Sequence, residues 1–84
     1  MKEIYLTKHA IKRLQDRKIS FEEVRETIFQ SKWNDAKHSR FYATKVFQFD
    51  QEQKGSKYEY KEVTVFFTEE SDKIIAITAI AKYF

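Results

Sequence analysis

The chain has one glycine and no proline, so the two residues that most often interrupt helices and strands are almost absent. Its secondary-structure elements must end instead at capping residues and at polar segments. The same scarcity excludes a glycine-rich phosphate loop and, with it, the common nucleotide-binding enzymes. At 84 residues the chain can fill one hydrophobic core but not two, so we expect a single domain over residues 1–84.

Capping residues predict two helices near the N-terminus. Thr7 is a good N-cap and an apolar stripe follows it, so we expect a helix that ends near Arg17 or Lys18. Ser20 and Glu23 have the spacing of a capping box, in which each side chain bonds the backbone amide of the other residue. This box predicts a second helix that runs to about residue 30.

Three later segments, residues 41–49, 58–67 and 74–81, have the composition of strands. Their short connections favour antiparallel neighbours. We therefore predict an α+β fold in which two N-terminal helices pack on one face of a three-stranded antiparallel sheet, in the order ααβββ. Segment 74–81 is apolar on both faces, so it either lies centrally or meets a partner, such as a second copy in a homodimer through the sheet.

The absence of cysteine excludes disulfides, thiolate nucleophiles and cysteine-based metal sites. The two histidines lack the spacing of a zinc motif, so we expect no metal and no cofactor. The first residues lack the apolar region of a signal peptide, and the longest apolar run, residues 74–81, is too short to span a bilayer. These features predict a cytoplasmic protein that does not contact a membrane.

The net charge of +3 is unevenly distributed. Residues 1–20 contain six lysines and arginines and two acidic residues, a net charge of +4, and the other 64 residues have a net charge of −1. Clustered positive charge favours a nucleic acid or an acidic protein as a partner. A solvated basic helix face is the alternative explanation.

His9, Arg13 and Arg17 follow one another at helical spacing and form a candidate site for anions. His9 lies near the helix N-terminus, where a neutral imidazole could act as a general base. Arg17 turns toward the boundary of the core, where a guanidinium needs an acceptor. That acceptor could be a phosphate or a structural acid such as Glu23, or it could be the end of the sheet.

Other basic and aromatic side chains are candidates for contacts with RNA. Lys37, His38 and Arg40 form a second basic cluster before the first expected strand, and an ordinary surface loop is the alternative explanation. Aromatic and basic groups that share a sheet face can stack bases and hold phosphates, although such residues also simply suit half-exposed strands. The strand residues of this kind are Tyr42, Lys45, Tyr58, Tyr60, Lys61, Lys82 and Tyr83.

Within residues 6–24, the stretch from Thr7 to Val24 matches the pattern [S/T]-x-H-A-x-x-R-x-x-x-R-x-I-S-x-x-x-V. This segment resembles the opening of small bacterial proteins with a domain of unknown function of the DUF4258 type, which are similar to the RelE and BrnT toxin superfamily. The likeness continues in outline through residues 40–42 and 75–80. It implies the same order of helices and sheet as the residue patterns do.

The resemblance also implies a toxin-type protein that cleaves RNA without a metal. In that chemistry a base deprotonates the 2′-hydroxyl, which attacks the adjacent phosphate while cations stabilise the developing charge. The implied catalytic residues are His9, Arg13 and Arg17. The expected contacts with nucleic acid are Lys8, Lys12, Arg40, Lys82 and Tyr83, and the expected partners are an acidic antitoxin protein and RNA or the ribosome.

Two further hypotheses compete with a ribonuclease. The first is a non-catalytic basic module that binds an acidic partner protein or a nucleic acid. The second is that His9, Arg13 and Arg17 are structural residues, which bond the end of the sheet or the turn at Ser20.

Overall fold

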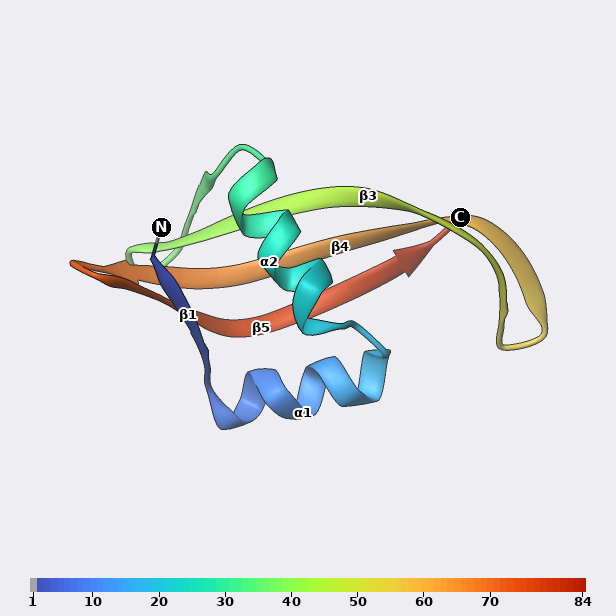
Figure 1. Ribbon diagram of the computed structural model, residues 1–84, viewed down its shortest axis with the longest axis horizontal. Helices are drawn as coiled ribbons and strands as arrows, with labels where there is room; N and C mark the ends of the chain where they lie inside the picture. Colours follow the sequence, from blue (N-terminus) through green and yellow to red (C-terminus); the bar gives the residue numbers. More distant parts are fainter. Residues whose placement is uncertain (1) are drawn as a thin grey trace.

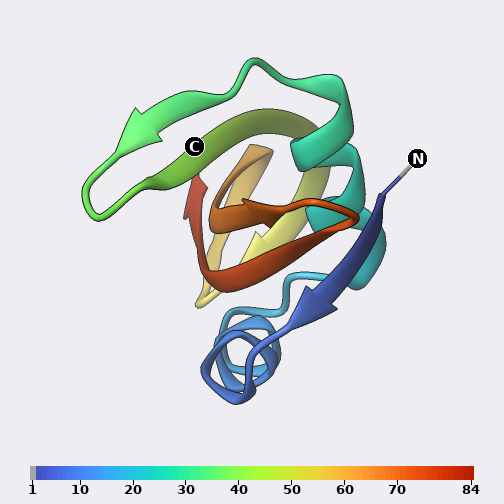
Figure 2. The same ribbon diagram turned by 90° about the vertical axis from the view of Figure 1, so that its left-hand side faces the viewer.

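The computed structural model describes residues 2–84. In chain order the elements are β1 (Glu3–Leu6), α1 (Lys8–Arg17), α2 (Phe21–Gln30), β2 (Asn34–Ala36), β3 (Arg40–Gln53), β4 (Ser56–Glu70) and β5 (Lys73–Tyr83). The strands form one curled sheet in the order β1-β5-β4-β3-β2, and both helices pack against it (Figure 1, Figure 2). The fold is therefore α+β, as predicted.

The prediction of a three-stranded antiparallel sheet is wrong, because the sheet has five strands and is mixed. β1 pairs with β5 in parallel, with Ile4 opposite Ile74, and β2 pairs with the first residues of β3. The two additional strands have four and three residues, which is too short for a pattern of alternation to stand out. The three long strands form the expected antiparallel meander.

Both helices begin at the predicted caps. The Thr7 hydroxyl accepts a hydrogen bond from the amide of Ala10 over 3.0 Å. Ser20 Oγ accepts from the amide of Glu23 over 3.1 Å, and Glu23 Oε1 accepts from the amide of Ser20 over 2.9 Å, which completes the capping box. Lys18 caps the C-terminus of α1, and its left-handed conformation, with φ 54°, turns the chain toward α2.

The core lies between the helices and one face of the three long strands, which we call the core face. Trp33 packs against the core just after α2. Its indole N–H donates to the Ile28 carbonyl over 2.7 Å, and its ring packs edge to face with that of Phe67, with the two centroids 4.8 Å apart. The fully buried side chains include Val24, Ile28, Ala43, Val63, Val65, Phe67, Ile74 and Ala79.

The opposite face of the sheet, which we call the open face, has no helix on it. Its side chains alternate in register with those of the core face. They are Tyr42, Thr44 and Val46 of β3, Tyr60, Glu62, Thr64 and Phe66 of β4, and Thr78, Ile80 and Lys82 of β5. The register thus separates the strand tyrosines and lysines that could have shared one RNA-binding face, because Lys45, Lys61 and Tyr83 lie on the core side.

α1 covers the edge of β5 that extends past β1. β1 pairs with β5 only as far as Ala76. There the Thr7 amide donates to the carbonyl of Ala76 over 3.1 Å, and its hydroxyl donates to the carbonyl of Ile77 over 3.2 Å. Arg17, at the other end of α1, donates to the carbonyl of Ala79. The helix therefore supplies donors to an edge that would otherwise be open.

Candidate functional site

The predicted group of His9, Arg13 and Arg17 is divided along α1. His9 is exposed near the start of the helix, and Arg13 Nε donates to its Nε2 over 3.4 Å. Arg13 also lies 4.0 Å from Asp16, at a distance typical of a weak surface ion pair. These two residues face solvent, and they lie about 12 Å (His9) and about 6 Å (Arg13) along the helix axis from Arg17.

Arg17 is turned toward the sheet. Its Nη1 donates to the carbonyl oxygen of Ala79 over 2.6 Å, and its side chain is half-buried. Each step of four residues rotates about 40° around a helix, so two steps carry Arg17 from the solvent side to the edge of β5. A guanidinium has five N–H donors, and this contact uses one of them.

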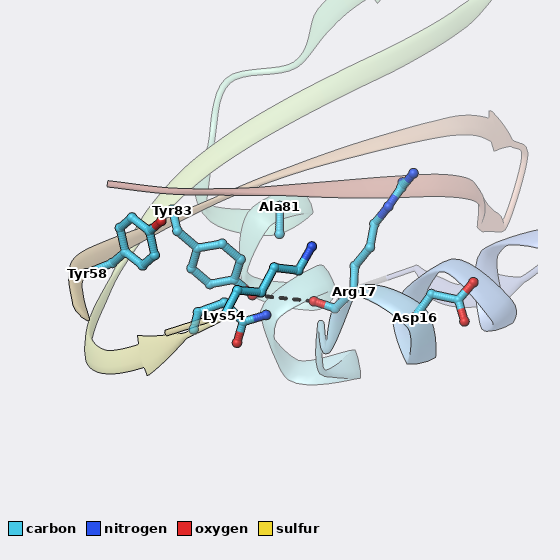
Figure 3. Close-up of a pocket in the computed structure, with 7 residues that line it drawn as sticks. Asp16, Arg17, Lys54, Tyr58, Ala81 and Tyr83 are labelled. Carbon is cyan, nitrogen blue, oxygen red and sulfur yellow. Dashed lines mark hydrogen bonds between the residues drawn. The ribbon is translucent and has the colours of Figure 1, made fainter. Parts of the chain in front are cut away.

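Arg17 and Tyr83, two of the predicted site residues, meet in an open cavity of about 270 Å³. The cavity, which we call the hairpin pocket, lies between the end of α1, the end of β5 and the β3–β4 hairpin (Figure 3). Its lining consists of Asp16, Arg17, Gln53, Lys54, Tyr58, Ala81 and Tyr83. It thus combines two cationic side chains, one carboxylate and two phenols.

The shape of the hairpin brings Lys54 and Tyr58 into the pocket. The pairing of β3 with β4 shifts between Gln48 and Gln51, and the hairpin bends there (Figure 1). Lys54 and Gly55 form the two-residue loop, with φ of 52° and 81°. Positive φ at both positions suits the turn that two-residue hairpins prefer, and glycine adopts it without strain.

Tyr83 lies among aromatic rings at the base of the pocket. Its ring centroid is 4.9 Å from that of Phe49 and 5.9 Å from that of Tyr58. Its hydroxyl donates to the carbonyl of Arg17 over 3.5 Å. Burial raises the pKa of the Tyr83 phenol above its ordinary value, and the nearby carboxylate of Glu23 raises this pKa further. The phenol therefore stays protonated at neutral pH and can act as a donor.

Lys61, which the sequence analysis considered only as an RNA contact on a strand, lies beside this site. Its side chain is buried, with 4% of the residue exposed. Its Nζ donates to the Lys18 carbonyl over 2.7 Å and to Glu23 Oε1 over 2.9 Å, and it lies 6.0 Å from the Tyr83 ring centroid. The sequence held a signal for this placement, since Lys61 alternates with Val63 and Val65 and so shares their buried face.

A second hollow, of about 330 Å³, lies on the open face, where the β2–β3 turn approaches β5. We call it the basic groove. Its floor is apolar, and its rim contains Lys37, His38 and Arg40, whose side chains make no hydrogen bond or ion pair within residues 2–84. The lining consists of Ala36, Lys37, His38, Arg40, Phe66, Ile77 and Thr78.

The other predicted nucleic-acid contacts lie outside both cavities. Lys8 and Lys12 are exposed on α1, and Lys82 is exposed on the open face. The structure therefore places the eight predicted site residues on three surfaces, which are the solvent side of α1, the hairpin pocket and the open face. Only Arg17 and Tyr83 share a cavity.

The described residues contain neither a metal-binding cluster nor a membrane-spanning helix. No group of three or more histidine and acidic side chains within residues 2–84 could hold a metal ion. Neither α1 nor α2 has the length and apolar character to cross a membrane.

Comparison with known families identifies one match, to a domain of unknown function (DUF4258), over residues 6–81. The match spans most of the chain, so the protein belongs to this family. No curated protein and no solved structure matches the chain in the corresponding comparisons.

Proposed function

From this membership in the DUF4258 family, we propose that the protein is a cytoplasmic toxin-type protein, similar to RelE and BrnT, that binds RNA in the hairpin pocket. One observation carries the proposal. Arg17 and Lys54 line the same open cavity as the rings of Tyr58 and Tyr83. Sites for single-stranded RNA usually combine cations, which hold the phosphates, with aromatic rings, on which the bases stack.

The charge of α1 supports the same proposal. Lys8 and Lys12 are exposed on the helix that ends at the pocket. Such charges attract a polyanion at a distance and contribute to affinity without reading sequence. We therefore expect RNA binding that weakens as salt concentration rises.

The pocket also holds groups suited to RNA cleavage without a metal, which we propose as its chemistry. The carboxylate of Asp16 would take the proton of the 2′-hydroxyl, and the 2′-oxygen would form a bond to the adjacent phosphorus. Arg17 and Lys54 would stabilise the charge on the phosphoryl oxygens. The Tyr83 phenol would give its proton to the leaving 5′-oxygen as the P–O5′ bond breaks, which yields a cyclic phosphate and a 5′-hydroxyl. In this scheme His9, about 12 Å from Arg17 along α1, has no part.

Binding is tested by fluorescence anisotropy with a labelled single-stranded RNA oligonucleotide. We expect Tyr58→Ala to raise the Kd by about tenfold, since a lost stacking contact costs about 1–3 kcal/mol. Lys54→Ala should also raise the Kd, because it removes a cation that neutralises a phosphate. Tyr60→Ala on the open face and Lys57→Ala on the same hairpin are matched controls, because neither residue lines the pocket. Equal losses in the control and pocket variants, or no binding by the wild-type protein, would overturn the proposal.

Cleavage is tested with messenger RNA in the presence of a chelator, with and without ribosomes. We expect fragments that end in a cyclic phosphate, and we expect Asp16→Asn to abolish them while RNA binding persists. If the protein binds RNA but does not cleave it, either with or without ribosomes, the proposed cleavage is wrong and only the proposed RNA binding stands.

The basic groove favours a second candidate function, the docking of an acidic antitoxin protein. Its apolar floor between Phe66 and Ile77 suits an apolar side chain, and its unpaired cations suit neighbouring carboxylates. The test is co-purification with a small acidic protein encoded beside this one. Arg40→Glu should abolish it, and Lys82→Glu, on the same face outside the groove, should not. If both variants retain the partner, the groove is not the docking site.

A further inference from the structure

The two edges of the sheet differ in how they are closed. Beyond Ala76, α1 supplies donors to the edge of β5. At the other edge, β2 pairs only with residues 40–42 of β3. From Ala43 to Gln48, β3 has β4 on one side and no strand on the other. No hydrogen bond within residues 2–84 reaches the backbone of this segment from outside the β3–β4 ladder.

This open edge ends where the hairpin bends, so six residues are free to pair with another strand. An unpaired edge of this kind is a template for strand addition. Val46 lies at its middle and is 46% exposed, on the open face of the sheet. Both features indicate that a further strand would fit here.

The segment is complementary to a second copy of itself. In a symmetric antiparallel pair, the two-fold axis passes either through a residue position or between two residues. Only an axis through a residue position puts the core-face side chains of one copy opposite the core-face side chains of the other. Centred on Lys45, the pairing would bring two ammonium groups together. Centred on Val46, it brings the two Val46 side chains together and places Lys45 opposite Phe47 of the second copy. The Lys45 ammonium already lies 5.4 Å from the Phe47 ring centroid within one chain, so this cross-strand pair is favourable.

We infer that two copies of this chain pair antiparallel through the free edge of β3, about a two-fold axis at Val46, to form one continuous sheet. The pairing covers Val46 and gives backbone partners to residues 44–48. It involves few residues on each chain, so the dimer should dissociate on dilution. The inference rests on the sheet alone and does not depend on RNA binding.

The absence of cysteine from the chain allows a direct test. In antiparallel strands, residues directly opposite have Cα atoms about 4.5–5.5 Å apart, within the range that a disulfide spans. Under mild oxidation, Val46→Cys should therefore form a covalent dimer in high yield. Ile80→Cys is the matched control, since Ile80 is 45% exposed on the same face but two strands from the edge.

Sedimentation velocity provides the second measurement. The wild-type protein should shift from monomer to dimer as its concentration rises, and Val46→Lys should remain monomeric with an unchanged melting temperature. A wild-type protein that stays monomeric at every concentration would overturn the inference. So would rapid crosslinking of Ile80→Cys without crosslinking of Val46→Cys, because that result would indicate packing of two open faces instead.

Discussion

The guanidinium of Arg17 donates a hydrogen bond of 2.6 Å to the carbonyl oxygen of Ala79, and this contact joins the last turn of α1 to the edge of β5. It gives Arg17 a structural role as well as a place in the hairpin pocket. The first arginine, Arg13, has only surface contacts. The two arginines should therefore respond differently to substitution.

Arg17→Ala should lower the free energy of unfolding by about 1–3 kcal/mol, because it leaves a half-buried carbonyl without its charged donor. Arg13→Ala should change the same quantity by less than about 0.5 kcal/mol, as expected for a solvated surface pair. Urea denaturation of the two variants beside the wild-type protein measures both. Equal losses would show that the Arg17 contact adds nothing to stability.

Lys61→Ala should destabilise the protein by about 3 kcal/mol, since it leaves the Glu23 carboxylate without its buried partner. Lys61→Met keeps the volume of the side chain and should cost less. Replacing both partners, with Lys61→Met and Glu23→Gln together, should cost less than the sum of the single changes. Chemical denaturation of the wild-type protein, Lys61→Met, Glu23→Gln and the double variant measures this coupling. Strict additivity of the losses would argue against an energetic link between the two side chains.

Thr7→Val should destabilise the protein by about 1–2 kcal/mol, because it removes the helix cap and the hydroxyl donor to Ile77 together. Thr7→Ser keeps the hydroxyl and is the matched control. Thermal unfolding of the two variants compares them. The assignment fails if the serine variant melts as low as the valine variant.

Tyr83 should make the stability of the fold sensitive to alkaline pH. Its pKa is raised in the folded protein, so the folded state holds the phenolic proton more tightly than the unfolded state does. Its contribution is complete below the ordinary pKa of 10.0 and is lost as the pH rises through the folded value. The stability difference between the wild-type protein and Tyr83→Phe should therefore move in favour of the variant between about pH 8 and pH 11. A difference that stays constant across this range would contradict the expectation.

The helices could be predicted from sequence because their signals are local. Thr7 lies beside the helix that it caps, and Ser20 and Glu23 are close enough to cap each other. The long strands could be located as well, although β3 and β4 extend into the hairpin that was expected to be a connection. Each of these elements contains enough residues for its pattern to be seen.

The contacts that define the candidate site are not local, and the sequence did not reveal them. The acceptor for Arg17 is a backbone carbonyl on β5, which has no side-chain signature, whereas Glu23 pairs with Lys61. Lys54 and Tyr58 enter the pocket only because the hairpin bends between Gln48 and Gln51. Helical spacing could place Arg17 at the boundary of the core, but it could not identify what lies there.

The parallel pairing of β1 with β5 also determines when the fold can be completed. Thr7, at the end of β1, and Ile77 of β5 are 70 positions apart and are hydrogen-bonded. Contacts between distant parts of a chain form late and slow folding, because the closure of a long loop must precede them. During synthesis β1 cannot pair until β5 has been made. The N-terminal residues must therefore wait, with both helices already able to form, for β5 to leave the ribosome.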